Sequence, residues 1–318
     1  MSFLTVCLSP AFQKTLRFAS VIPGTVNRTA VHRLDTAGKG INVTRVLNQM
    51  GKKAVHLTQL GGPMRPLFLS LCAEDSLSLE WVESYSPVRF CYTLIDGPRS
   101  SVTELVEEAC PVEAGTEQRL LEKFDSLSPG HNCLIISGSR TAGFSGDLIP
   151  LMVQKGKKNG LAVILDIKGL DLINSLPYGP DIIKPNLFEF ALTFAPQLIK
   201  NNDLLNDENA VRERIQSEAA ALCEKYNCRI ILTRGSEKIW AAEPGRFFEA
   251  AFNPVTPVNV TGSGDAFTAG LAAALDDGAD FAAAIAEGIR YGALNALCFR
   301  PGVIRETPLC GEESPGGK

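Results

Sequence analysis

The segment 259–267, Asn-Val-Thr-Gly-Ser-Gly-Asp-Ala-Phe, places an aspartate and two glycines at the predicted start of a helix. Glycines let backbone amides point into a shared concavity, and a helix N-terminus adds the positive end of a dipole. Gly262, Ser263 and Gly264 therefore form a candidate site for phosphoryl oxygens. A carboxylate beside such an anion is useful when it accepts a proton from an attacking hydroxyl, which is the role we expect for Asp265. The alternative is helix capping, because acidic side chains favour the first turn.

A second glycine-rich turn, Ala-Gly-Lys-Gly-Ile-Asn at 37–42, also precedes a predicted helix. Lys39 lies between two glycines and can reach an anionic ligand, while the Asn42 amide can both donate and accept hydrogen bonds with hydroxyl groups. The spacing and the missing Lys-Ser/Thr pair exclude a Walker A loop. An ordinary strand-to-helix turn explains this segment equally well.

The third segment is Lys-Pro-Asn-Leu-Phe-Glu at 184–189. Asn186 and Glu189 are three residues apart, so they share one face of a first helical turn. Their oxygens suit Mg²⁺, which keeps most of its waters and needs few protein ligands. The alternative is a capping box with Asn186 as N-cap and Glu189 at the third helical position. These residues alone favour the capping box.

Strand-like and helical stretches alternate along the chain. Short β-branched runs lie at residues 4–8, 54–60, 133–137, 161–166, 181–184 and 229–233. Helical patterns separate them, as at 40–50 and 209–226, and two more follow at 264–274 and 281–297. This alternation predicts an α/β fold with parallel strand pairing and helices on both faces of the sheet.

Two regions, 25–34 and 88–106, read as strands without an intervening helix. In the second region, a turn at 96–99 separates strands at 90–95 and 101–106. We expect these segments to form a small antiparallel sheet that acts as a lid. The domain prediction is one domain over 1–311, with lid strands from about 12–34 and 88–106, and a disordered tail at 312–318.

Composition excludes several classes of protein. The 318 residues carry a formal net charge of -4, which gives no sign of a nucleic-acid partner. No run of 18 apolar residues suggests a membrane span, and the first residues do not read as a signal peptide. The nine cysteines are scattered and contain no C-x-x-C pair, so we expect a reduced, cytoplasmic protein without a disulfide framework.

Taken in order, these motifs resemble those of the PfkB-type, or ribokinase-like, carbohydrate kinases. The resemblance covers nearly the whole chain, and its most specific part is Val-Thr-Gly-Ser-Gly-Asp-Ala-Phe-Thr-Ala-Gly at 260–270. Three segments are similar to the phosphosugar branch, which comprises the 1-phosphofructokinases and tagatose-6-phosphate kinases. They are the sequence at 39–47, the Val-Asn-Arg triplet at 26–28 and Thr-Glu-Leu at 103–105. The resemblance implies a three-layer α/β/α fold with a mostly parallel sheet and a small β-sheet lid.

The resemblance also implies an activity and roles for matching residues. Members of this branch transfer the γ-phosphate of ATP, with Mg²⁺, to a hydroxyl of a ketohexose monophosphate. Asp265 matches the catalytic base, and the backbone amides of Gly262, Ser263 and Gly264 match the anion hole. The residues matching the sugar-phosphate site are Gln13, Arg28, Gly38, Lys39, Asn42, Arg89 and Ser137. The residues matching the ATP site are Lys184, Asn186, Glu189, Thr233, Gly235 and Asn295, with Asn186 and Glu189 also holding Mg²⁺ through water.

Two departures from the family pattern leave the sugar open: Gln13 stands where the family usually has an aspartate that binds sugar hydroxyls, and Ala37 replaces the first glycine of the usual GGKG. A further departure, Arg234 in a triplet that more often reads Ser-Leu-Gly, falls at the expected nucleotide pocket. The first substrate expected is D-fructose 1-phosphate, which would give fructose 1,6-bisphosphate. The alternatives are tagatose 6-phosphate or another phosphosugar, and a non-catalytic sugar-phosphate-binding protein. Exposed lid strands also suggest a homodimer.

Overall fold

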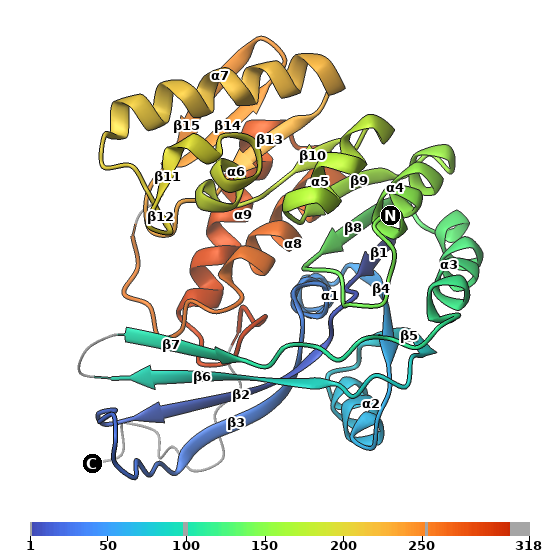
Figure 1. The fold of residues 1–318 in the computed structure, drawn as a ribbon, viewed down its shortest axis with the longest axis vertical. Helices are drawn as coiled ribbons and strands as arrows, with labels where there is room; N and C mark the ends of the chain where they lie inside the picture. Colours follow the sequence, from blue (N-terminus) through green and yellow to red (C-terminus); the bar gives the residue numbers. More distant parts are fainter. Residues whose placement is uncertain (1, 98–100, 252–253, 306–318) are drawn as a thin grey trace.

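A mostly parallel sheet runs through the centre of the molecule (Figure 1). The computed structural model describes residues 2–97, 101–251 and 254–305. Within them, the sheet order is β15-β14-β13-β10-β9-β8-β1-β4-β5; the pairs β13–β14 and β14–β15 are antiparallel, and the other pairs are parallel. The strands are β1 (Ser2–Val6), β4 (Lys53–Leu60), β5 (Ser78–Glu83), β8 (Cys133–Ser137), β9 (Ala162–Asp166), β10 (Ile182–Ile183), β13 (Arg229–Leu232), β14 (Ile239–Glu243) and β15 (Arg246–Ala250).

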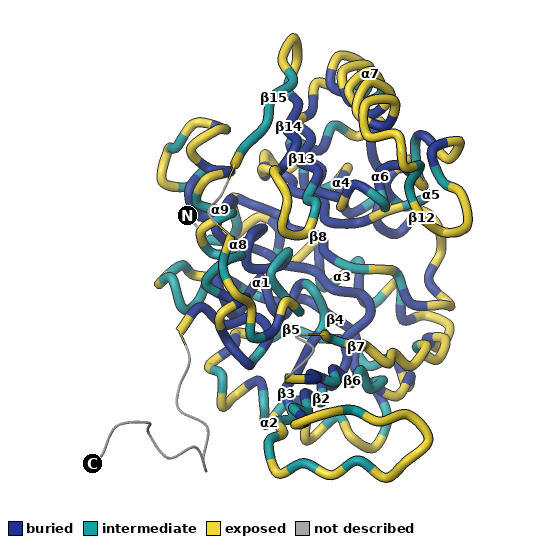
Figure 2. The backbone as a smooth tube through the Cα atoms, turned by 90° about the vertical axis from the view of Figure 1, so that its left-hand side faces the viewer, coloured by how far each residue is buried: buried dark blue, intermediate teal, exposed yellow. Residues whose placement is uncertain are grey.

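Helices cover both faces of this sheet, because its strands are apolar on both sides. In β8, Leu134 and Ile136 join one core cluster, while Cys133 and Ile135 join the other. The first cluster packs under α3 (Thr116–Leu127), α4 (Leu148–Lys158), α5 (Gly169–Ser175), α6 (Leu187–Phe194) and α7 (Glu208–Tyr226). The second packs under α1 (Lys39–Gln49), α8 (Ser263–Asp276) and α9 (Phe281–Ala296). Figure 2 shows the buried segments in the interior of the molecule and exposed ones at its surface. The central sheet with a core cluster and helices on each face confirms the predicted α/β/α fold.

A separate four-stranded sheet lies beside the main body (Figure 1). Its order is β3-β2-β6-β7, from β3 (Val31–Ala37), β2 (Ala11–Phe18), β6 (Arg89–Asp96) and β7 (Ser101–Val106). We call it the lid sheet. The outer two pairs are antiparallel as predicted, but the antiparallel prediction is wrong for the central pair, because β2 and β6 pair in parallel. A long crossover through the main sheet, not a hairpin, joins these two strands. Helix α2 (Arg65–Glu74) packs near it through a third apolar cluster that includes Phe12 and Phe68.

The predicted strand at 25–34 is wrong over its first part, because regular pairing begins only at Val31. Gly24 adopts a left-handed φ of 79° and turns the chain. The Asn27 amide then ties the loop, accepting from the Ile22 nitrogen at 2.9 Å and donating to the Ile22 carbonyl at 2.9 Å. These local bonds compete with strand pairing.

Other sequence predictions have mixed outcomes. The strands near 90–95 and 101–106 and the four long helices are confirmed within two residues at each end. The sequence missed β5, β14 and β15, and also the short antiparallel pair β11 (Ile199–Lys200) and β12 (Asp203–Leu204). The tail at 312–318 lies outside the described residues. No two cysteines of the described part are joined by a disulfide, and no helix there is long and apolar enough to cross a membrane.

Candidate active site

The site is centred on the turn that opens helix α8. Gly262 precedes the helix with a left-handed φ of 85°, and a Cβ there would lie 2.8 Å from the backbone nitrogen of Gly302. Only glycine fits this position. Asp265 follows in the first turn and is only 6% exposed. Its Oδ2 accepts a hydrogen bond from Asn42 Nδ2 at 2.8 Å, so the two glycine-rich turns recognised in the sequence meet at this carboxylate.

Asn295 supports the same turn from helix α9. Its Nδ2 donates to the Thr261 carbonyl at 3.0 Å and to Ser263 Oγ at 3.3 Å. Its Oδ1 accepts from the Gly302 nitrogen at 2.7 Å. Asn295 is fully buried, so within this chain it holds the backbone of the anion-hole turn. Its predicted contact with the nucleotide stays a prediction.

Two lysines reach the site and share one carboxylate. Asp166, at the end of β9, lies 3.2 Å from Lys39 Nζ and 3.1 Å from Lys184 Nζ. Asp166 and Lys184 are each 3% exposed, whereas the Lys39 side chain is 41% exposed. Lys184 Nζ lies 3.8 Å from where a Cβ at Gly264 would stand, beside the start of α8.

The sequence did not select Asp166 as a site residue. The available signal was its place at the carboxyl end of a parallel strand, where ligands of open α/β sheets bind.

Burial and charge set the protonation of these groups. Burial raises the pKa of Asp265 to about 7, the Asp166 charge adds to the rise, and Lys39 and the Asn42 hydrogen bond oppose it. Burial also pushes the pKa of Asp166 up, but the ammonium groups of Lys184 and Lys39 outweigh it and hold that pKa below its usual range. Asp166 in turn raises the pKa of Lys39. Asp265 is thus poised to exchange a proton near neutral pH beside two cations.

Except for Arg28, the predicted sugar-side residues lie at the junction of the main sheet and the lid sheet. Gly38 has a φ of 122°, and a Cβ there would lie 2.9 Å from Cys7 Sγ. Ser137 Oγ, at the end of β8, is buried and has no hydrogen-bond partner within the described part of the chain. Gln13 is also buried, and its Nε2 donates to Thr93 Oγ1 at 2.8 Å. Gln13 therefore lies inside the lid sheet with part of its amide already engaged.

Arg89 and Arg28 lie in different surroundings. Arg89 starts β6, opposite Ala11, and donates from Nη1 to the Glu107 carbonyl at 2.9 Å. Its Nε is buried without a hydrogen-bond partner among the residues described. Burial is the main cause of the raised pKa of the Cys7 thiol; the charge of Arg89 lowers that pKa and the charge of Asp265 raises it, so Arg89 lies within electrostatic range of the thiol that Asp265 also influences. Arg28 is exposed in the β2–β3 loop, and the structure does not bring it to this group.

Four of the predicted ATP-side residues, Asn186, Glu189, Thr233 and Gly235, lie together around the start of α6. Asn186 Oδ1 accepts from the Glu189 nitrogen at 2.8 Å, and Glu189 Oε2 accepts from the Asn186 nitrogen at 3.1 Å. This is the capping box that the sequence offered as the alternative. Asn186 also shares the lining of a hollow of about 490 Å³ with Thr233 and Gly235.

The residues fit a Mg²⁺ ion held mainly by phosphates and water. Within the described ranges, no cluster of three or more His, Cys, Asp or Glu side chains could form a protein cage for a metal. The Glu189 carboxylate, engaged by one backbone nitrogen and lying 3.4 Å from Lys168 Nζ, keeps lone pairs for a metal-bound water.

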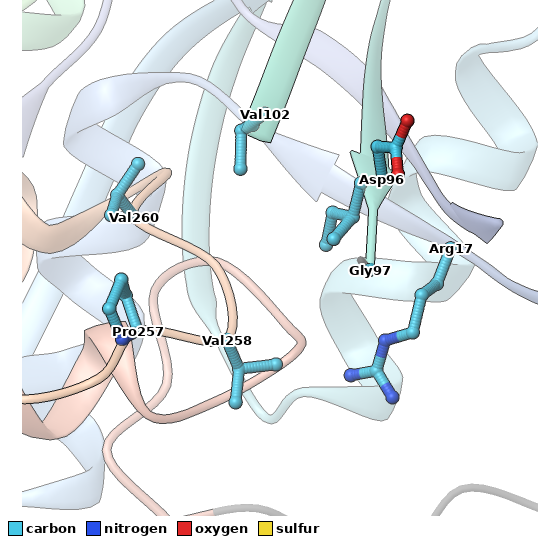
Figure 3. A pocket seen from close by; sticks show the side chains of 8 residues that line it. Arg17, Asp96, Gly97, Val102, Pro257, Val258 and Val260 are labelled. Atoms are coloured by element: carbon cyan, nitrogen blue, oxygen red, sulfur yellow. The ribbon is translucent and has the colours of Figure 1, made fainter. Parts of the chain in front are cut away.

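A second hollow, of about 380 Å³, separates the lid sheet from the loop that leads into Gly262 (Figure 3). Arg17, Asp96 and Val102 line one side, and Pro257, Val258 and Val260 line the other. None of the predicted site residues borders it. The hollow lies where the lid-sheet strands β2 and β6 end and β7 begins, away from the predicted site residues.

Comparison with known proteins decides the family. The model of the pfkB family of carbohydrate kinases matches residues 11–307. The chain belongs to the pfkB family. It is therefore an ATP-dependent sugar kinase, as the motifs around Asp265 predicted.

Solved structures of similar fold accompany this pfkB match. A mutant of Escherichia coli phosphofructokinase-2 superposes with a TM-score of 0.81 at 20% identity, covering 94% of each chain. A Thermotoga maritima protein named a possible 1-phosphofructokinase has a TM-score of 0.77 at 20% identity, covering 93% of this chain and 91% of its own. Thermotoga maritima ribokinase has a TM-score of 0.70 at 16% identity, covering 95% of each. At these identities the likeness establishes the ribokinase-like fold.

Proposed function

We propose that this pfkB-family kinase transfers the γ-phosphoryl group of ATP to a hydroxyl of a ketohexose monophosphate, with D-fructose 1-phosphate as substrate and fructose 1,6-bisphosphate as product. One observation carries the proposal. Two cations act electrostatically on one corner of the site: the half-exposed Lys39 acts on Asp265, and Arg89, whose buried Nε has no partner among the described residues, acts on the Cys7 thiol, which Asp265 also influences. A neutral sugar gives no reason for two cations at that corner, whereas a sugar phosphate does.

The proposed mechanism uses these residues in sequence. Lys39, Arg89 and Ser137 hold the phosphate already on the sugar, and the lid sheet excludes water that would hydrolyse ATP. Asp265 accepts the proton of the attacking hydroxyl as the new oxygen–phosphorus bond forms and the bond to the ADP oxygen breaks. The backbone amides of 262–264, with Lys184 beside Gly264, stabilise the charge on the transferring group.

We place ATP in the hollow next to α6. Thr233, Gly235 and Asn186 border the hollow next to α6, which suits ATP, and Asn295 supports the adjoining anion-hole turn. Mg²⁺, held through water by Asn186 and Glu189, would neutralise phosphate charge when bound.

A hexose 6-phosphate is the second candidate substrate. Escherichia coli phosphofructokinase-2, which shares the fold at 18% identity, has been solved with fructose-6-phosphate. Gln13 does not distinguish between the 1-phosphate and the 6-phosphate, because its amide already donates to Thr93.

The test is ADP release from MgATP with fructose 1-phosphate, tagatose 6-phosphate, fructose 6-phosphate and unphosphorylated fructose. We expect the highest kcat/KM with fructose 1-phosphate and the lowest with fructose. A preference for unphosphorylated fructose would overturn the proposal. Turnover with none of the four, by a folded protein that binds ATP, would favour a sugar-phosphate-binding role.

A further inference from the structure

Arg45 lies one helical turn after Asn42 on α1 and is only 3% exposed. Every nitrogen of its guanidinium group has a partner. Nε pairs with Asp75 Oδ2 at 2.9 Å, and Nη2 donates to the Thr36 carbonyl at 2.8 Å and to Thr36 Oγ1 at 3.1 Å. The remaining nitrogen, Nη1, donates to Asn42 Oδ1 at 3.0 Å and to the Pro301 carbonyl at 3.4 Å.

This last contact fixes which way the Asn42 amide points. An asparagine amide has one end that accepts hydrogen bonds and one end that donates them. Arg45 has no acceptor to offer, so it holds the carbonyl end of Asn42. The donating end is thereby left to face Asp265 Oδ2 at 2.8 Å. If the amide rotated by half a turn, its oxygen would face a carboxylate.

We propose that Arg45 is a positioning residue for the catalytic base, because it fixes the Asn42 amide so that its Nδ2 donates to Asp265. The inference rests on the proposed role of Asp265 as the base. Arg45 itself does not touch Asp265, and it acts through Asn42 alone.

The surroundings of Arg45 keep it in place. Arg300 pairs with both Asp35 and Asp75, so the carboxylate that receives Arg45 is itself anchored. Gly302 closes the other side: a Cβ there would lie 2.8 Å from Asn42 Oδ1 and 2.9 Å from Arg45 Nη1. The same glycine donates to Asn295, which holds the anion-hole turn. The same buried cluster, formed by Arg45, Gly302 and Asn295, therefore positions both the base and the anion-hole turn.

Loss of the fixed amide should change how Asp265 titrates. The charged or titratable groups acting on Asp265 are Lys39, Asp166 and Lys184, and Asp265 in turn acts on Cys7. The Asn42 hydrogen bond lowers the pKa of Asp265 against the rise caused by burial. Without Arg45, the amide no longer donates reliably, and the pKa of the base moves up.

The experiment is a double-mutant cycle with Arg45→Lys, Asn42→Ala and the combined variant. The readout is the pH profile of kcat/KM with the best phosphosugar and MgATP. Lysine keeps the positive charge, but its single ammonium group cannot hydrogen-bond Asp75, Thr36 and Asn42 at the same time. We expect Arg45→Lys to lower kcat about tenfold to a hundredfold, as small misplacements of reacting groups do, and to move the acidic limb to higher pH. In the Asn42→Ala background, Arg45→Lys should add little to either effect.

Gln49→Ala is the matched control. Gln49 lies one turn further along α1; its side chain bonds the Arg45 carbonyl, the Gly302 carbonyl and the Ile304 nitrogen, so it touches only backbone groups and neither the Arg45 guanidinium nor the Asn42 amide is among its hydrogen-bond partners. We expect it to lower thermal stability and leave the pH profile in place. Circular dichroism and ATP binding check folding, and Arg45→Met with Asp75→Asn is the second variant if lysine is not tolerated.

The outcomes separate the two hypotheses. Equal effects of Arg45→Lys with and without Asn42, or an unshifted acidic limb in a folded variant, would overturn the positioning role. An Asp265→Asn enzyme with normal kcat would instead remove the base on which the inference rests.

Discussion

Thr261 Oγ1 donates a hydrogen bond to Glu104 Oε1 at 3.0 Å. Glu104 belongs to strand β7 of the lid sheet, and Thr261 directly precedes the Gly262 turn. The lid sheet and the anion hole are therefore joined by one polar contact between residues far apart in sequence. The contact lies beside Val260, which borders the hollow under the lid sheet (Figure 3).

We expect Glu104→Ala to weaken closure of the lid sheet over the sugar. A solvent-accessible hydrogen bond contributes about 1 kcal/mol, so KM for the phosphosugar should rise about fivefold with little change in kcat. Initial rates at saturating MgATP measure this. Glu108→Ala is the control, because Glu108 lies just beyond β7 and is also exposed. Equal effects from both variants would mean that the Thr261 contact does not matter.

The elevated pKa of Asp265 predicts the pH dependence of the reaction. A base works when ionised, and burial raises its pKa to about 7, so kcat/KM should increase with pH up to about that value and then level off. Asp265→Asn keeps the shape but cannot accept the proton, so we expect kcat to fall by about 10²–10⁴-fold with ATP affinity nearly unchanged. Steady-state rates from pH 5 to 9 and ATP titration of the variant test both statements. A kcat that the substitution leaves unchanged contradicts the assignment.

Arg89 should act on the sugar phosphate and not on ATP. Charge-assisted hydrogen bonds contribute about 1.5–3 kcal/mol, so Arg89→Ala should raise KM for the phosphosugar by about tenfold or more. Lys14→Ala is the control, because Lys14 is a cation on the neighbouring strand that bonds His32. An effect of Arg89→Ala confined to the KM of ATP would show that the pocket is misassigned.

The sequence predicted what depends on short-range patterns. The glycine and aspartate spacing at 262–265 identified the helix start, and β8 at Cys133–Ser137 was predicted to the residue. The capping box at Asn186 was also visible, because its partners are three residues apart.

The sequence did not reveal contacts between distant residues. Asp166 lies 127 positions from Lys39, and charges that far apart in sequence cannot be paired without the fold. The support that Asn295 gives to Thr261 was missed for the same reason. The β14–β15 hairpin does not follow from the alternation of strands and helices, because it pairs antiparallel at the sheet edge with no helix between its strands.

Asp166 links the two lysines of the site, so its loss should affect both stability and titration. Asp166→Asn leaves the buried Lys184 ammonium without its counter-charge, and breaking a buried pair in this way costs about 3–5 kcal/mol. The native pKa of Asp166 is depressed, so its contribution is present above the unfolded pKa of about 4 and is lost as pH falls through the lower folded pKa. Urea unfolding of the wild-type and Asp166→Asn proteins at pH 7 and under acid conditions measures the free energy of unfolding. The difference between the two proteins should be smaller under acid conditions.

The same substitution should shift the catalytic base downward. The Asp166 charge raises the pKa of Asp265, so its removal should move the acidic limb of kcat/KM to lower pH, opposite to the shift expected for Arg45→Lys. Asp171→Asn is the matched control, since its partly exposed pair with Arg140 should contribute about 0–1 kcal/mol. An acidic limb that stays in place in folded Asp166→Asn protein would mean that Asp166 does not act electrostatically on the base.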